Sequence, residues 1–220
     1  MLVSDVIQRV KDITADVDGT RWSDSRLIRE INAAQFHFCT STNILRDTVN
    51  LVVSSDQSNY TIPYCDTLLN AKYNNLPLSL ITDFDLDKTI PTWETEQGEP
   101  KYLVFNNLNR SIVRLYPTPN FKASEVFDLE TANTLNVTYT KYPKEVSGTT
   151  DTLEVPDIYL EPLVYYITGN LFRSDLDSLN RQFGAEQFQL YNSFIAKVKA
   201  SSSKSFTSNP DAFLASYRRF

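Results

Sequence analysis

The sequence predicts an α+β fold. Helices from both ends of the chain form one four-helix lobe, and a small antiparallel β-sandwich or barrel lobe is inserted between them. Nine of the ten prolines lie between residues 63 and 162, and proline disrupts helix interiors because it lacks an N–H and clashes with the preceding turn. Apolar residues recur every three or four positions near both ends, as on one face of a helix. Between them lie short runs rich in Val, Ile, Thr and Tyr, which are typical of strands.

Residues 1–44 predict a pair of helices. In the first helix the apolar positions follow spacings of three and four: Val3, Val6, Ile7, Val10 and Ile13. The second helix begins at Ser23, a favourable N-cap, with Asp24 in its first turn, and it ends by residues 40–43. Its buried stripe is expected at Leu27, Ile31, Ala34 and Phe38, with Ile28 beside it.

Residues 45–155 predict the inserted β lobe. The expected strands are 48–53, 60–63, 76–80, 102–105, 112–116 and 135–142. Residues 106–109, with the sequence Asn-Asn-Leu-Asn, favour a hairpin turn between two of these strands.

Residues 156–200 predict a second pair of helices that packs with the first pair. Pro162 is tolerated only in a first turn, so the third helix is expected to start near Tyr159. Its stripe is Leu160, Leu163, Val164, Ile167 and Leu171. A longer helix then runs from Asp175 to about Ala200.

Residues 201–220 differ in composition from the rest of the chain. Residues 201–205 have the composition of a flexible linker, and an aromatic and arginine-rich segment follows: Phe206, Phe213, Leu214, Tyr217, Arg218, Arg219 and Phe220. This extended tail carries +2, whereas residues 1–200 carry −8, from 18 basic and 26 acidic side chains. Aromatic and arginine side chains are common interface anchors, so we expect a partner-binding arm. The alternative is a disordered or self-packed end.

Composition excludes several kinds of chemistry. His37 is the single histidine, and Cys39 and Cys65 have no CxxC spacing, so we expect no metal site and no cofactor. The five glycines are too dispersed for a nucleotide-binding loop, and a net charge of −6 argues against a protein that grips nucleic acid. No apolar run is long enough to span a membrane, and the N-terminus lacks a secretion signal, which makes the cytoplasm the default compartment. We expect a binding or structural protein rather than an enzyme.

Two local features each allow a structural and a functional interpretation. Asp83, Asp85, Asp87 and Glu94 follow the spacing of a calcium loop. Lys88, however, stands where that loop needs glycine, so we expect an acidic, solvated loop or rim. At Arg21-Trp22-Ser23-Asp24 we expect the tryptophan to pack at a helix start, while Arg21 and Trp22 are also candidates for an intersubunit contact.

The two ends together resemble the tailed-phage head-to-tail adaptor proteins, also called connector or gatekeeper proteins. The matching residues near the N-terminus are Ser4-Asp5-Val6-Ile7-Gln8-Arg9-Val10, Arg21-Trp22-Ser23-Asp24, Leu27-Ile28-Arg29 and Ile31-Asn32-Ala33-Ala34-Gln35. Near the C-terminus they are Pro156-Asp157, Leu163, Tyr165-Tyr166 and Asp175. The resemblance covers residues 1–40 and 155–200, with a β lobe between them.

The resemblance implies a virion protein at the head–tail junction that is assembled in the host cytoplasm. Such a protein forms a homo-oligomeric ring, typically of twelve copies, beneath the portal ring, and offers a platform to the tail nozzle or tube. Genomic DNA passes through the ring without sequence-specific contact. Residues 201–220 would bind the portal, the helical lobe would lie on the portal side, and the acidic residues 83–94 would face the tail or the channel.

A second function remains open from the sequence. A tail-associated β lobe that binds a carbohydrate or a host receptor would use exposed aromatic side chains, and Trp93 and Tyr73 are the candidates.

Overall fold

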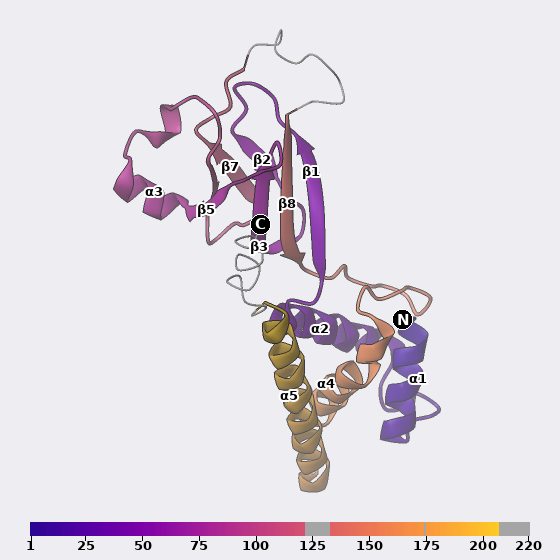
Figure 1. Cartoon of the computed structure of the whole chain (residues 1–220). Coiled ribbons are helices and arrows are strands. Elements are labelled where there is room, and N and C mark those ends of the chain that lie inside the picture. Colours follow the sequence, from indigo (N-terminus) through magenta and orange to yellow (C-terminus); the bar gives the residue numbers. More distant parts are fainter. Residues whose placement is uncertain (122–132, 174, 207–220) are drawn as a thin grey trace, which may run out of the picture. The chain divides into compact units, whose positions relative to one another are not determined.

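A computed structural model of the 220-residue chain describes residues 1–121, 133–173 and 175–206, with side chains to residue 200. The chain divides into two compact units (Figure 1). Met1–Thr42 and Pro143–Phe220 make up the first, here called the helical unit, and Asn43–Tyr142 make up the second, the β unit. Residues 143–155, expected in the inserted lobe, belong to the helical unit in this division.

Four α-helices form the helical unit: α1 Val3–Thr14, α2 Asp24–Thr42, α4 Leu160–Arg173 and α5 Ser178–Phe206. A 3₁₀ turn, η4 at Asp157–Tyr159, leads into α4. Within this unit α4 lies between α1 and α5 (Figure 1) and packs against both of them and α2. The predicted stripes are the buried ones: Val6, Val10, Leu27, Ile31, Phe38, Leu163 and Ile167 are all at most 1% exposed.

The long helix α5 differs from the expectation at both ends. It begins at Ser178 rather than Asp175, because the Asp177 carboxylate accepts a hydrogen bond from the Leu179 N–H (2.8 Å) as an N-cap does. It also continues through residues 201–205 to Phe206, so the prediction of a flexible linker there is wrong. Serine and lysine lower helix stability by only a fraction of 1 kcal/mol each, and the next helix breaker is Pro210.

The β unit holds two four-stranded sheets. Their strands are β1 Arg46–Val52, β2 Asn59–Thr61, β3 Cys65–Tyr73, β4 Leu76–Pro77, β5 Ser79–Thr82, β6 Tyr102–Phe105, β7 Ile112–Tyr116 and β8 Thr134–Lys141. The first sheet has the order β1-β8-β3-β4 and is antiparallel throughout. The second has the order β2-β7-β6-β5, with β5 parallel to β6. A short helix, α3 (Asp83–Thr89), and the 3₁₀ turn η1 (Trp93–Thr95) follow β5.

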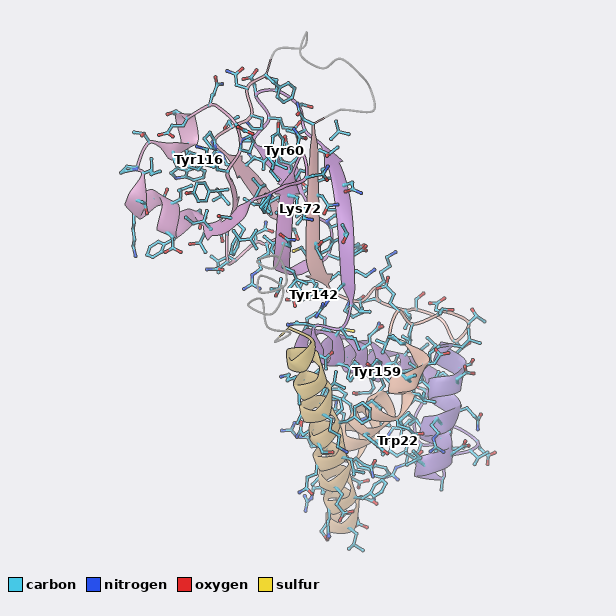
Figure 2. All side chains as sticks on the ribbon, viewed as in Figure 1. Trp22, Tyr60, Lys72, Tyr116, Tyr142 and Tyr159 are labelled. Carbon is cyan, nitrogen blue, oxygen red and sulfur yellow. The ribbon has the colours of Figure 1, made fainter. Side chains whose placement is uncertain are left out.

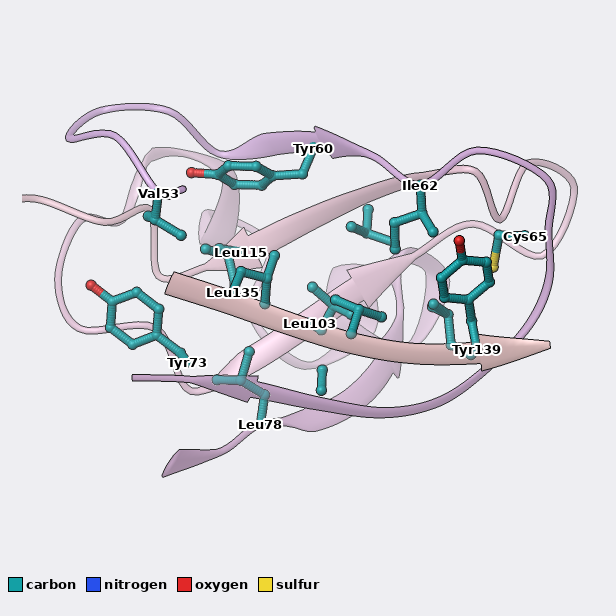
Figure 3. Packing of buried hydrophobic residues seen from close by; sticks show 14 residues of the cluster. Val53, Tyr60, Ile62, Cys65, Tyr73, Leu78, Leu103, Leu115, Leu135 and Tyr139 are labelled. Atoms are coloured by element: carbon teal, nitrogen blue, oxygen red, sulfur yellow. The ribbon is translucent and has the colours of Figure 1, made fainter. Parts of the chain in front are cut away.

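Apolar side chains from both sheets meet in one core (Figure 3). Leu103 and Leu115 from the second sheet and Leu135 from the first are fully buried there. Over the described residues neither sheet closes into a barrel. The α+β prediction is confirmed, with two open sheets as the form that the inserted lobe takes.

The longest strand, β3, was not predicted. It pairs with β8, but the register shifts between Cys65 and Thr67 and again between Leu68 and Asn70. Each shift is a bulge that moves the following side chains to the other face. The alternation of apolar and polar residues that identifies a strand is therefore broken twice within nine residues.

Candidate functional site

The loop between α1 and α2 is organised around one buried carboxylate. Asp16, which is 7% exposed, accepts hydrogen bonds from the backbone N–H groups of Arg21 (3.0 Å) and Trp22 (3.0 Å) and from the Thr20 hydroxyl (3.3 Å). These donors, led by the Arg21 N–H, hold the pKa of Asp16 below its usual value. Asp16 therefore holds the loop backbone at Arg21 and Trp22 independently of the contacts that their side chains make.

Trp22 packs inside the helical unit, as expected for a tryptophan at a helix start (Figure 2). Its ring is 4% exposed and meets Phe172 of α4 edge to face, with 5.2 Å between the ring centroids. Because this contact lies within one chain, the structure places Trp22 in the core of its own subunit.

Arg21 joins the two helical pairs at the surface. Its guanidinium group forms an ion pair with Asp175, which precedes α5, and lies 4.4 Å from the Trp22 ring and 4.9 Å from the Phe172 ring. The pKa of Asp175 is lowered by hydrogen bonds from the Asp177 N–H and the Asn180 amide and by the charge of Arg21. Residues 154 positions apart thus form one cluster, here called the junction site: Asp16, Arg21, Trp22, Phe172 and Asp175.

A shallow depression adjoins the junction site. A depression of about 330 Å³ is lined by Arg21, Trp22, Arg26, Leu171, Asp175 and Leu176. The Leu176 side chain is 96% exposed beside the charged pair. In the described part of the chain, no three His, Cys, Asp or Glu side chains are grouped to hold a metal ion. An arginine held over aromatic rings next to an exposed leucine is an arrangement common at interfaces.

Sequence reasoning missed a second cluster, on α2. The Asn32 amide donates to the Val146 carbonyl (2.8 Å) and accepts from the Val146 N–H (2.9 Å), as a neighbouring strand would. Gln35 donates to the Lys144 carbonyl (2.8 Å). These amides hold the segment that returns from the β unit against α2. The sequence signal that could have indicated this cluster is the pair of amide side chains three positions apart on one face of the helix.

The acidic residues of the β unit do not form the loop that was predicted. Asp83, Asp85 and Asp87 lie on α3, which Thr82 caps by accepting a hydrogen bond from the Asp85 N–H (3.1 Å). A threonine before three acidic residues is a good helix start, because the first turn favours negative charge. Glu94 lies on η1, where its carboxylate is 3.6 Å from Arg114.

The two aromatic residues that were candidates for binding a carbohydrate or a host receptor are buried. Trp93 is 4% exposed, and its indole N–H donates to Asp87 (2.6 Å). Tyr73 is 6% exposed in the core between the sheets. The prediction that these rings are exposed is wrong, and the alternative function loses the residues that suggested it.

The structure leaves the predicted portal-binding residues largely undescribed. Phe206 is the last residue of α5. The others, Phe213, Leu214, Tyr217, Arg218, Arg219 and Phe220, lie outside the described residues, so their role stays a prediction.

One comparison with known proteins identifies a family. The family model described as SU10 adaptor protein matches residues 1–212, which include both helical pairs and the β unit. No curated protein matches the chain. Among the described helices, none combines the length and the apolar character needed to cross a bilayer.

Proposed function

This chain belongs to the SU10 adaptor protein family, and on that premise we propose that it is a structural head-to-tail adaptor of a tailed phage. Copies form a ring, of twelve by analogy with similar adaptors, beneath the portal. The ring extends the DNA channel and anchors the tail nozzle or tube. The observation that carries this proposal is the extent of the family match, which covers nearly the whole chain rather than one lobe.

The charge of the protein suits a ring around DNA. Residues 1–200 carry a formal charge of −8, and an acidic wall repels phosphate groups, so a genome can slide past it without being held. Of these acidic residues, Asp85, Asp87 and Glu94 are exposed, whereas Asp83 is half-buried. We assign this acidic surface to the channel or to the tail interface.

Portal binding is assigned to the C-terminal segment. Its aromatic side chains and two arginines are typical interface anchors, and the segment follows directly after the 29-residue helix α5. Arg21 is 41% exposed despite its ion pair and is kept as a proposed intersubunit contact.

Removing the segment tests the assignment. Deletion of residues 207–220 leaves α5 complete and should leave the thermal unfolding temperature of the protein unchanged, while binding to purified portal rings is lost. A full-length variant with Phe213, Tyr217 and Phe220 replaced by serine keeps the length of the segment but removes three aromatic rings. It should also fail to bind portal rings if these side chains make the contact. Portal binding by the truncated protein at the affinity of the intact chain would refute the assignment.

A further inference from the structure

A groove on the α4–α5 pair carries two arginines that have no acidic partner in the described residues. Its volume is about 350 Å³, and it is lined by Arg173, Arg181, Gly184, Ala185 and Phe188. Gly184, Ala185 and the Phe188 ring form its apolar floor. Among the described residues, neither arginine forms an ion pair with a carboxylate. The groove therefore suits a small apolar group that has a carboxylate beside it.

The corner between α1 and α2 presents such a group on the same unit. Val17 is 67% exposed, and the next residue, Asp18, is exposed and makes no hydrogen bond to the described residues. The base of the corner is held by hydrogen bonds, because the Asp16 carboxylate accepts from the Arg21 and Trp22 N–H groups and the Gly19 N–H donates to the Asp16 carbonyl (2.9 Å). A preformed corner loses little conformational freedom on binding.

Other exposed apolar side chains next to acids fit the groove less well. Ile158 is 76% exposed, but the neighbouring Asp157 is already paired with the N-terminal ammonium group (2.7 Å). Phe84 is 63% exposed, but its ring lies under the Lys88 ammonium group at 3.9 Å, and Asp85 is bonded to Thr82. Val17 differs from both, because within the described residues the neighbouring Asp18 carboxylate forms neither a hydrogen bond nor an ion pair.

We propose that the Val17–Asp18 corner of one copy docks into the α4–α5 groove of a second copy, with Val17 against Phe188 and Asp18 between Arg173 and Arg181. Val17 is 67% exposed in the single copy, so its side chain is free to contact another molecule. The corner follows α1, the groove is built on α5, and these two helices lie on either side of α4 (Figure 1). One copy can therefore use both surfaces at once.

Such a contact is heterologous, because two different surfaces meet, and heterologous contacts close into rings when the rotation between copies allows it. The inference rests on the proposed ring and specifies which surfaces hold neighbouring copies together.

Disulfide trapping tests the contact in the full-length protein. Val17→Cys and Ala185→Cys are made in separate chains, mixed and oxidised, both alone and with portal rings added. The native thiols do not compete, because Cys39 and Cys65 are buried and burial raises their pKa values to about 12 and about 11. We expect the mixed dimer to exceed the homodimers of each variant by about tenfold.

The matched control replaces Ala185→Cys by Lys197→Cys, an exposed position on the same helix outside the groove. This pair should give no excess of mixed dimer. If Val17→Cys and Ala185→Cys cross-link no better than the control pair, alone and with portal rings, the proposal is overturned.

A charge exchange gives a second measurement. Asp18→Arg and Arg181→Asp should each weaken self-association by about tenfold in sedimentation velocity, and combining both changes in one chain should restore it. A double variant as weak as either single variant would contradict the pairing. Sedimentation with portal rings is scored separately, so a chain that cross-links through the corner but does not bind portal would refute the adaptor role and leave this contact standing.

Discussion

Asp16 shows how much one residue contributes to the junction site. A carboxylate with a lowered pKa in the folded state stabilises the protein above its unfolded-state pKa of about 3.9, and this contribution is lost as the pH falls through the folded-state value. The direction of the shift therefore links the order of the α1–α2 loop to acid stability.

Replacing Asp16→Asn should lower the unfolding temperature at pH 7, because an amide has a single acceptor oxygen for two backbone N–H groups. The difference from the unmodified protein should shrink below about pH 4, where the aspartate of the unfolded chain begins to protonate. Calorimetry between pH 2.5 and pH 7 measures both effects. A difference that stays constant over this range would show that the charge of Asp16 does not matter.

His37 provides a second test at the residue scale, because it is the single histidine of the chain. Its Nδ1 shares a hydrogen bond with the Tyr191 hydroxyl (2.6 Å), whose pKa is raised by burial. Desolvation and the charge of Lys199 lower the pKa of His37. A histidine with a lowered folded-state pKa favours the folded state above about pH 6.5 and loses that contribution as the pH falls below it.

The unfolding temperature should therefore decrease between pH 7.5 and pH 5.5 more steeply in the native protein than in a His37→Gln variant. Parallel thermal scans across this range measure the two slopes. Equal slopes would contradict a lowered pKa of His37 in the folded protein.

At this scale, the sequence predicted where a residue lies in an element more easily than which distant residue it contacts. Trp22 was placed at a helix start by its neighbours Ser23 and Asp24, which are local signals. The partner of Arg21 was not found, because Asp175 lies 154 positions away and an ion pair between surface residues leaves no periodic pattern.

At the scale of elements, two glycines set the distance between α4 and α5. A Cβ on Gly184 would lie 3.1 Å from the carbonyl oxygen of Gly169 and 3.1 Å from the Cβ of Phe172. A Cβ on Gly169 would lie 2.8 Å from the Phe188 ring. The backbones of the two helices approach one another closely at this point.

Gly184→Ala should therefore destabilise the protein by about 1–3 kcal/mol, as overpacking usually does, despite the higher helix propensity of alanine. Gly148→Ala is the matched control, since its Cβ would meet no atom closer than 3.7 Å. Urea unfolding of both variants measures the effect. A Gly184→Ala protein as stable as the control would show that the helices can separate at little cost.

The elements that sequence reasoning found are those with an uninterrupted period. All four long helices repeat every three or four residues, and β6 and β7 match the predicted ranges. The strand β3 was missed because its bulges break the alternation, and α3 was missed because Asp83, Asp85 and Asp87 suggested a loop. Trp93 was taken as exposed because its partners, Asp87 and Tyr116, meet it through tertiary packing.

At the scale of the whole molecule, the β unit is a continuous segment whose two ends lie together. The Lys141 N–H donates to the Leu45 carbonyl (3.0 Å), and Arg46 pairs with Thr140 where β1 begins and β8 ends. The unit also has its own core of 14 buried side chains. These are the properties of an independently folding domain.

Residues 43–142 expressed alone should unfold cooperatively on heating, with a circular dichroism spectrum typical of β structure. In the remaining chain, a short Gly-Ser linker between Thr42 and Pro143 should leave a helical protein that also unfolds cooperatively. Failure of the β segment to show a thermal transition would mean that its stability depends on the helices.

The paired ends of the β unit also determine how it responds to force. Tension applied through residues 43 and 142 reaches the ladder at its Arg46–Thr140 end, and the hydrogen bonds of an antiparallel pair lie perpendicular to the strands. The load would fall on one bonded pair at a time and open the strands like a zipper. We therefore expect the unit to open at low force when it is pulled through the chain that tethers it, whatever its thermal stability.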